Sequence, residues 1–234
     1  MLLGIFTYVH GKNVPANHTL YFPFFKDLGV PLGMTAFVII ATLVLTGTSN
    51  AVNLTDGLDG LAAGTMAIVS FTFFILAVIV GTESIEIGDK PAASGLLLAH
   101  VTGAEEMAVV AAALAGACMG FLWFNCFPAK VFMGDTGSLA LGGLIGYVSI
   151  VIRQELMLFL VGGVFVMEAV SVLLQVSWFK YTRRRYGEGR RIFLMSPLHH
   201  HFQKKGWPEA KVVVRFWLIT AMLAAMALAT VKLR

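Results

Sequence analysis

The chain has 234 residues, of which 58% are hydrophobic and only 13% are charged, and its net charge is +4. Soluble domains have roughly 25% charged residues, so this composition excludes a disordered chain, a secreted disulfide scaffold and most soluble enzymes. A polytopic membrane protein remains. One spanning helix needs about 20 apolar residues, so six spans with their loops nearly use up the chain.

The first 30 residues are predicted to lie outside the helix bundle. They begin with an apolar stub, Met1 to Val9, which is too short to span a membrane and lacks the features of a signal peptide. We interpret this stub as the end of a helix whose beginning is absent. The segment that follows contains Pro15 and Pro23, and we expect it to form an external loop.

Residues 31–234 are predicted to form an all-α membrane bundle. Their apolar runs lack the two-residue alternation of a transmembrane barrel, and a hydrocarbon environment makes the backbone form its hydrogen bonds within helices. The small-residue pairs Gly116–Gly120 and Gly142–Gly146 predict closely packed helices. The six predicted helices cover residues 32–49, 61–80, 107–127, 137–152, 157–179 and 212–231.

Basic residues are concentrated on one side of this predicted bundle. Six spans place the loops at 50–60, 128–136 and 180–211 on the same side, and these loops contain ten Lys and Arg residues. The connecting loops of the opposite side contain only Lys90 and Arg153. Because cytoplasmic loops carry an excess of Lys and Arg, we expect the first side to face the cytoplasm and both chain ends to lie outside.

Polar side chains gather in the first of these loops. Asn53, Asp56 and Asp59 are spaced by three residues, so one helical turn would line them along a single face. A carboxylate at membrane depth is costly and usually faces protein or a water-filled cavity. Capping of the next helix by Asp56 or Asp59 would explain one aspartate, but not both of them together with Asn53. We therefore favour a functional site.

A second cluster runs from Asn125 to Ser138. Pro128 is expected to end the preceding helix. Asp135 either caps the helix that follows or coordinates a hard cation such as Mg²⁺, which prefers oxygen ligands and often shares them with substrate phosphates. Residue types alone leave both interpretations open.

The longest predicted loop has a charge of +7 and contains three adjacent histidines, His199, His200 and His201. A neutral imidazole binds metal, exchanges protons or donates to phosphate, and at most two consecutive helical residues should converge on one point. Glu168, in the middle of a predicted span, needs a partner or a wet cavity. It either forms a structural pair with Gln175 or has a catalytic role.

Taken together, these clusters predict a pocket of carboxylates, amides and imidazoles beneath a basic rim. The chain has no Walker loop, no G-x-S-x-G elbow and no His-Glu-x-x-His motif. Phosphate would therefore be held by basic side chains, a metal ion and helix ends. Such a site suits a metal-assisted reaction of a phosphorylated substrate at the membrane surface.

Four separated segments resemble the polyprenyl-phosphate N-acetylhexosamine-1-phosphate transferases. They are NAVNLTDGLDGLA at 50–62, FLWFN at 121–125, VFMGDTGSLA at 131–140 and PLHHH at 197–201. Within that family, the unbroken triple histidine followed by GWPE at 206–209 is similar to the phospho-N-acetylmuramoyl-pentapeptide transferases. The resemblance extends from about residue 20 to the C-terminus.

This resemblance implies an activity and its partners. Such enzymes, with Mg²⁺, transfer phospho-N-acetylmuramoyl-pentapeptide from its UDP carrier to undecaprenyl phosphate in the bacterial inner membrane. They release UMP and form the first lipid intermediate of peptidoglycan synthesis. The expected partners are therefore these two substrates and the lipid bilayer, with a possible homodimer and no nucleic acid.

The resemblance also implies residue roles. Asp135 would be the Mg²⁺ ligand, and Phe132 would stack on uracil. Asn125 and Asp59 would hold the nucleoside, while Asn53 and Asp56 would line the same pocket. His199, His200 and His201 would belong to the loop over the diphosphate and sugar. The expected catalytic set is Asp135, Asp56, His199 and His200.

The chain departs from the family in its upstream part. Full members resemble ten-helix proteins with an adjacent Asp-Asp pair, which this chain lacks. We therefore expect a fragment, the C-terminal part of the ten-helix fold, that does not catalyse the transfer alone. Two other functions stay open: transfer of a different UDP-N-acetylhexosamine phosphate, or a non-catalytic transporter half or scaffold. The triple histidine argues against the first, and the location of the polar residues at one face argues against the second.

Overall fold

The computed structural model describes residues 18–22, 29–82, 86–87, 90–91, 98 and 100–232. The predicted stub at 1–9 and most of the predicted external loop therefore lie outside the described residues. Two short antiparallel ladders are the only strands in the described part. β1 (Thr19–Tyr21) pairs with β2 (Gly29–Pro31), and β3 (Glu86–Ile87) pairs with β4 (Lys90–Pro91).

Apart from the loops that connect its elements, the rest of the described chain is helical, which confirms the predicted all-α polytopic bundle. Within it, five helices are long and apolar enough to cross a membrane: α2, α3, α5, α8 and α10. α6 is not among them, because its first turn is polar. The helices are α2 (Met34–Thr55), α3 (Leu61–Gly81), α5 (Glu106–Asn125), α6 (Gly134–Val151), α7 (Glu155–Val161), α8 (Gly163–Tyr186), α9 (Leu198–Lys204) and α10 (Glu209–Lys232).

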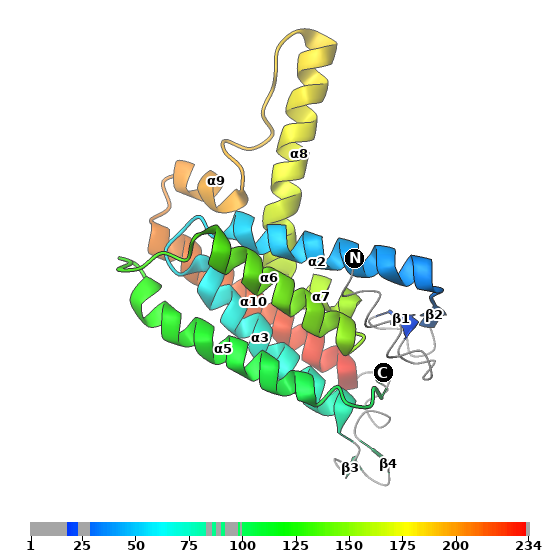
Figure 1. Ribbon diagram of the computed structural model, residues 1–234. Helices are drawn as coiled ribbons and strands as arrows, with labels where there is room; N and C mark the ends of the chain where they lie inside the picture. Colours follow the sequence, from blue (N-terminus) through cyan, green and yellow to red (C-terminus); the bar gives the residue numbers. More distant parts are fainter. Residues whose placement is uncertain are drawn as a thin grey trace.

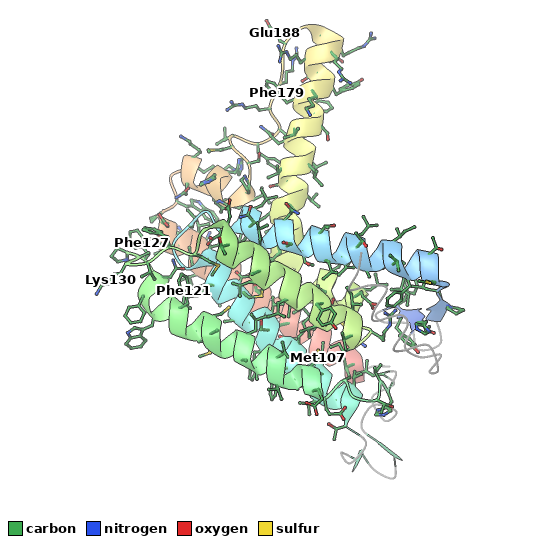
Figure 2. All side chains as sticks on the ribbon, in the orientation of Figure 1. Met107, Phe121, Phe127, Lys130, Phe179 and Glu188 are labelled. Atoms are coloured by element: carbon green, nitrogen blue, oxygen red, sulfur yellow. The ribbon has the colours of Figure 1, made fainter. Side chains whose placement is uncertain are left out.

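The predicted fifth span, 157–179, is wrong in its form. The chain breaks at Gly162 into the seven-residue α7 and the long α8, because two adjacent glycines weaken a helix at this point. α8 continues to Tyr186 and leaves the bundle (Figure 1). Phe179 and Glu188 mark this projecting part (Figure 2). The predicted 180–211 loop therefore contains the end of α8 and all of α9.

The core of the bundle is built around α3, which packs against α5 and α10, while α2 packs along α6 (Figure 1). Gly142 and Gly146 permit this second contact, because a Cβ on either would lie 2.4 Å from an oxygen of Thr48. The prediction of close packing is therefore confirmed for this pair. It is wrong for Gly116 and Gly120 within the described chain, since a Cβ there would meet nothing within 4 Å.

The end of the bundle near β1 is tied together by a buried ion pair. Arg153 Nη1 lies 2.6 Å from Glu155 Oε1, and both side chains are only 2% exposed. Arg153 also donates to the Thr19 carbonyl oxygen at 3.1 Å and stacks over the Phe37 ring. The charged residues of this connection between α6 and α7 therefore anchor a strand, and the predicted site lies elsewhere.

We predict that Gly142→Ala destabilises the protein, whereas Gly116→Ala does not. The new methyl group at residue 142 would meet the backbone of Thr48 and Ser49, and overpacking of this kind costs about 1–3 kcal/mol. At residue 116 the methyl group meets open space, and alanine favours a helix by roughly 0.5–1 kcal/mol over glycine. Thermal unfolding in detergent measures both; equal midpoints for the two variants would contradict the packing of α2 on α6.

Candidate functional site

Two segments far apart in the sequence, residues 53–59 and 125–135, meet at one end of the bundle, where α2 and α5 end and α6 begins. Phe127 and Lys130 of the α5–α6 connection mark this end (Figure 2). A cavity of about 300 Å³ opens here. Its walls are formed by the two predicted polar clusters, through Asn53, Asp56, Gly57, Leu58, Asp59, Asn125, Phe132, Met133, Gly134 and Asp135.

The capping alternatives for the aspartates are wrong. Gly60, with a φ of 75°, occupies the N-cap position of α3, and Met133 occupies that of α6; neither helix has a side-chain cap. α2 ends at Thr55, so Asp56 and Asp59 lie in the turn after it and not along a helical face. The turn nevertheless directs both residues to the same cavity as Asn53.

One side-chain amide joins the two clusters. Asn53 Nδ2 donates to Asp135 Oδ1 at 2.8 Å and to Ser138 Oγ at 3.0 Å. This fixes the orientation of Asp135, which lies in the first turn of α6, where the helix dipole favours a negative charge. Ser138 was not predicted as a site residue, although its position three residues after Asp135 on the same helix provides the signal.

A second set of hydrogen bonds shapes the loop between α5 and α6. Asn125 Oδ1 accepts from the Gly60 amide at 3.1 Å, and its Nδ2 donates to the Val131 carbonyl oxygen at 2.8 Å. Asp59 Oδ2 accepts from the Ala129 amide at 2.9 Å. Asn125 and Asp59 thus hold the backbone that presents Phe132, which is 78% exposed.

Glu209, the first residue of α10, also belongs to this framework. Its Oε1 accepts from the Asp59 backbone amide at 2.9 Å, and Trp217 Nε1 of the same helix donates to the Gly60 carbonyl oxygen at 3.2 Å. α10 therefore helps to fix the backbone of the first polar cluster at Asp59 and Gly60. Sequence reasoning gave Glu209 no role at the site, because no local pattern relates it to a loop 150 residues earlier.

The electrostatics of the cavity are dominated by two carboxylates. Burial, and then the charge of Asp135, raise the pKa of the Asp56 carboxyl above its ordinary value. Folding therefore makes ionisation of Asp56 less favourable than it is in the unfolded chain. A cation between Asp56 and Asp135 would relieve this penalty.

These donors fit a shared magnesium ion and not a complete protein cage. Among the described residues, no group of three or more His, Cys, Asp or Glu side chains converges on one point. Mg²⁺ is commonly held by one or two carboxylates together with waters and substrate phosphates. Asp135 and Asp56, with the Asn53 amide fixing Asp135, would supply such a partial site.

The three histidines lie within α9 and contact different neighbours. His199 is buried against Gly57, where a Cβ would lie 2.3 Å from its Nε2. His200 Nδ1 lies 2.7 Å from Gln203 Oε1. His201 Nδ1 accepts from the Leu194 amide at 3.1 Å, and burial and Lys205 lower the pKa of this imidazole. As far as the described residues form it, the cavity wall includes none of the three.

Glu168 and Gln175 of α8 hold this histidine segment in place, so the predicted pairing between them is wrong. Glu168 Oε1 accepts from the His199 amide at 3.2 Å, and its Oε2 lies 3.3 Å from His199 Nδ1, with both side chains almost fully buried. Gln175 Oε1 accepts from the amides of Ile192 and Phe193, both at 3.0 Å. Glu168 thus contacts the site only indirectly: it holds His199, and His199 packs against Gly57 of the cavity wall.

Comparison with known families agrees with this architecture. Residues 1–153 match the family model described as glycosyl transferase family 4. The matched region contains both polar clusters that form the cavity, and it ends before α7 and the histidine segment. The chain belongs to glycosyl transferase family 4, and it is a membrane transferase of the polyprenyl-phosphate sugar-phosphate class.

Proposed function

We propose that the chain takes part in the transfer of phospho-N-acetylmuramoyl-pentapeptide from UDP to undecaprenyl phosphate. The observation that carries this proposal is the convergence of Asn53, Asp56, Asp135 and the exposed Phe132 ring on one cavity of a family 4 chain. The triple histidine behind Gly57 favours this sugar over other UDP-N-acetylhexosamines. The excess of basic residues in the loops at this end favours a cytoplasmic location for the cavity, in the bacterial inner membrane.

In the proposed complex, the nucleoside lies at the Phe132 end of the cavity. The exposed ring offers a face on which uracil stacks, because stacking on an aromatic side chain requires an accessible ring. Asn125 and Asp59 hold the loop that positions this ring. The diphosphate then extends towards Asp135 and the α6 N-terminus.

The proposed reaction transfers the sugar-linked phosphoryl group from UMP to the lipid phosphate. An oxygen of the lipid phosphate attacks the sugar-linked phosphorus, a new P–O bond forms, and the bond to the uridylate oxygen breaks so that UMP leaves with the electron pair. When bound, Mg²⁺ would supply neutralisation of the diphosphate charge. Asp135 and Asp56 would hold it, and Asn53 would keep Asp135 oriented. Positioning and electrostatics therefore account for most of the proposed rate enhancement.

The first prediction from this proposal concerns the sugar nucleotide. With Mg²⁺ present, the purified chain in detergent should bind UDP-N-acetylmuramoyl-pentapeptide more tightly than UDP-N-acetylglucosamine in calorimetry. Phe132→Ala should weaken binding by about 1–3 kcal/mol through lost stacking. Phe127→Ala is the matched control, because Phe127 is exposed in the same loop but does not line the cavity. Tighter binding of UDP-N-acetylglucosamine, or no binding of either nucleotide, would refute the proposed substrate.

The carboxylate pair generates a second prediction. Asp56→Asn should raise the thermal midpoint without Mg²⁺, because it removes a charge that burial and Asp135 disfavour. The same variant, like Asp135→Asn, should lose most of the stabilisation that Mg²⁺ and the nucleotide give to the wild type. Glu188→Gln removes an exposed acid beyond the end of α8, far from the cavity wall, and is the control that should keep this response. If all three variants respond to Mg²⁺ like the wild type, the cation does not bind between Asp56 and Asp135.

A third prediction tests the support of the histidine segment by α8. Glu168→Ala should increase amide hydrogen exchange at His199 by about tenfold, because it leaves the buried His199 amide without its acceptor, which costs about 1–3 kcal/mol. Glu188→Gln removes an exposed acid beyond the end of α8 and should leave this exchange unchanged. Unchanged protection of His199 in Glu168→Ala would show that the buried contact does not order the segment.

A further inference from the structure

The corner between α9 and α10 carries two cations that are fixed on one aromatic ring. The Arg215 guanidinium lies 4.2 Å from the centre of the Trp207 ring, and Lys211 Nζ lies 5.4 Å from it. Trp207 is itself stacked on Phe202, with 4.6 Å between the ring centres. We call Trp207, Lys211 and Arg215 the α10 cationic corner. Its charges are held in place by packing.

The positive charge of this corner is not compensated. Among the described residues, no carboxylate forms an ion pair with Lys211 or Arg215, and both side chains are exposed. The nearest acid in the sequence, Glu209, directs its Oε1 to the Asp59 amide inside the bundle. The corner therefore offers two hydrogen-bonding cations to an external anion.

The same face of α10 continues as an apolar stripe. Leu218, Met222 and Met226 are 58%, 63% and 45% exposed, and their spacing from Arg215 keeps them on the side of the helix that carries the two cations. α10 is long and apolar enough to span a membrane. Arg215 lies six residues after Glu209, about 9 Å along the helix, so the charge sits near one membrane boundary and the stripe runs below it.

We propose that this face binds an anionic phospholipid. The lipid phosphate would accept hydrogen bonds from Arg215, whose planar fork suits a bidentate phosphate contact, and would pair with Lys211. The acyl chain would lie along Leu218 and Met222. Tryptophan is enriched at the membrane interface, and a lipid phosphate would offset the cost of a guanidinium at this depth.

This lipid site is separate from the sugar-nucleotide cavity. None of the three corner residues lines that cavity, and the lipid undergoes no reaction. The proposal therefore does not depend on the proposed transfer reaction, and the two can fail independently. The chemistry that identifies the ligand is a phosphate joined to an acyl chain, because the charged corner and the apolar stripe are continuous on one helix face.

The test measures lipid binding directly. The full chain is purified in detergent, titrated with phosphatidylglycerol or phosphatidylcholine, and examined by native mass spectrometry and thermal unfolding. We expect the wild type to retain phosphatidylglycerol in preference to phosphatidylcholine. Lys211→Gln combined with Arg215→Gln should weaken this retention about tenfold or more, because the lipid phosphate loses both of its charge-assisted hydrogen-bond donors.

The matched control removes two cations from elsewhere. Arg183→Gln combined with Arg184→Gln changes the charge equally at the exposed end of α8 and should leave the preference intact. Retention that falls equally in both double variants, or in neither, would overturn the proposal. A change in oligomeric state in the Lys211/Arg215 variant without a loss of lipid would assign the face to a second copy of the chain and would also overturn it.

A further arm uses only the wild type, so it does not depend on how the variants fold. Glycerol phosphate and inorganic phosphate carry the anion without an acyl chain, and they should not reproduce the thermal stabilisation by phosphatidylglycerol. Stabilisation by inorganic phosphate equal to that by the lipid would show that the apolar stripe takes no part, which would refute the lipid site.

Discussion

The contact between α2 and α6 is the constraint on which the rest of the site depends. Gly142 and Gly146 let α6 approach Thr48 of α2 so closely that no Cβ fits between the helices. At the end of the same contact, Asn53 reaches Asp135 and Ser138. Close packing inside the bundle and the orientation of the proposed magnesium ligand are thus two consequences of one helix pairing. A wider separation would leave the Asn53 amide without these two acceptors and Asp135 free to turn.

The carboxylates that the proposed chemistry needs in the cavity are unfavourable for the stability of the folded protein. Asp56 and Asp135 line the same cavity, and burial, followed by the charge of Asp135, raises the pKa of Asp56. The surrounding framework supplies the opposing stabilisation, through the hydrogen bonds of Asn125, Asp59 and Glu209 to loop backbone. Two carboxylates that disfavour each other's charge, held within a hydrogen-bonded framework, are the arrangement expected at a cation-binding site.

The sequence allowed the bundle and the carboxylates and amides of the cavity to be predicted, because long apolar runs and rare carboxylates are local signals. The imidazoles that were also predicted there do not line the cavity as the described residues form it. The division of α7 from α8 was missed, since Gly162 and Gly163 lie within a run whose hydropathy continues on both sides. Capping of α3 and α6 by aspartates was also a reasonable local interpretation. It failed because Gly60 and Met133 occupy those positions while the aspartates turn to the cavity.

The sequence could not reveal which buried side chains contact one another across the fold. Glu168 was recognised as a buried charge, but its partner His199 lies 31 residues later and meets it only because α8 leaves the bundle and the chain returns as α9. His199 then fills the space that Gly57 leaves open. Glu168 of α8 is therefore connected to the turn that carries Asp56 and Asp59 through the His199 imidazole, which packs against Gly57. A Cβ at residue 57 would overlap the His199 ring and would break this connection as effectively as the loss of His199. Gly57 therefore belongs to the site although it has no functional group.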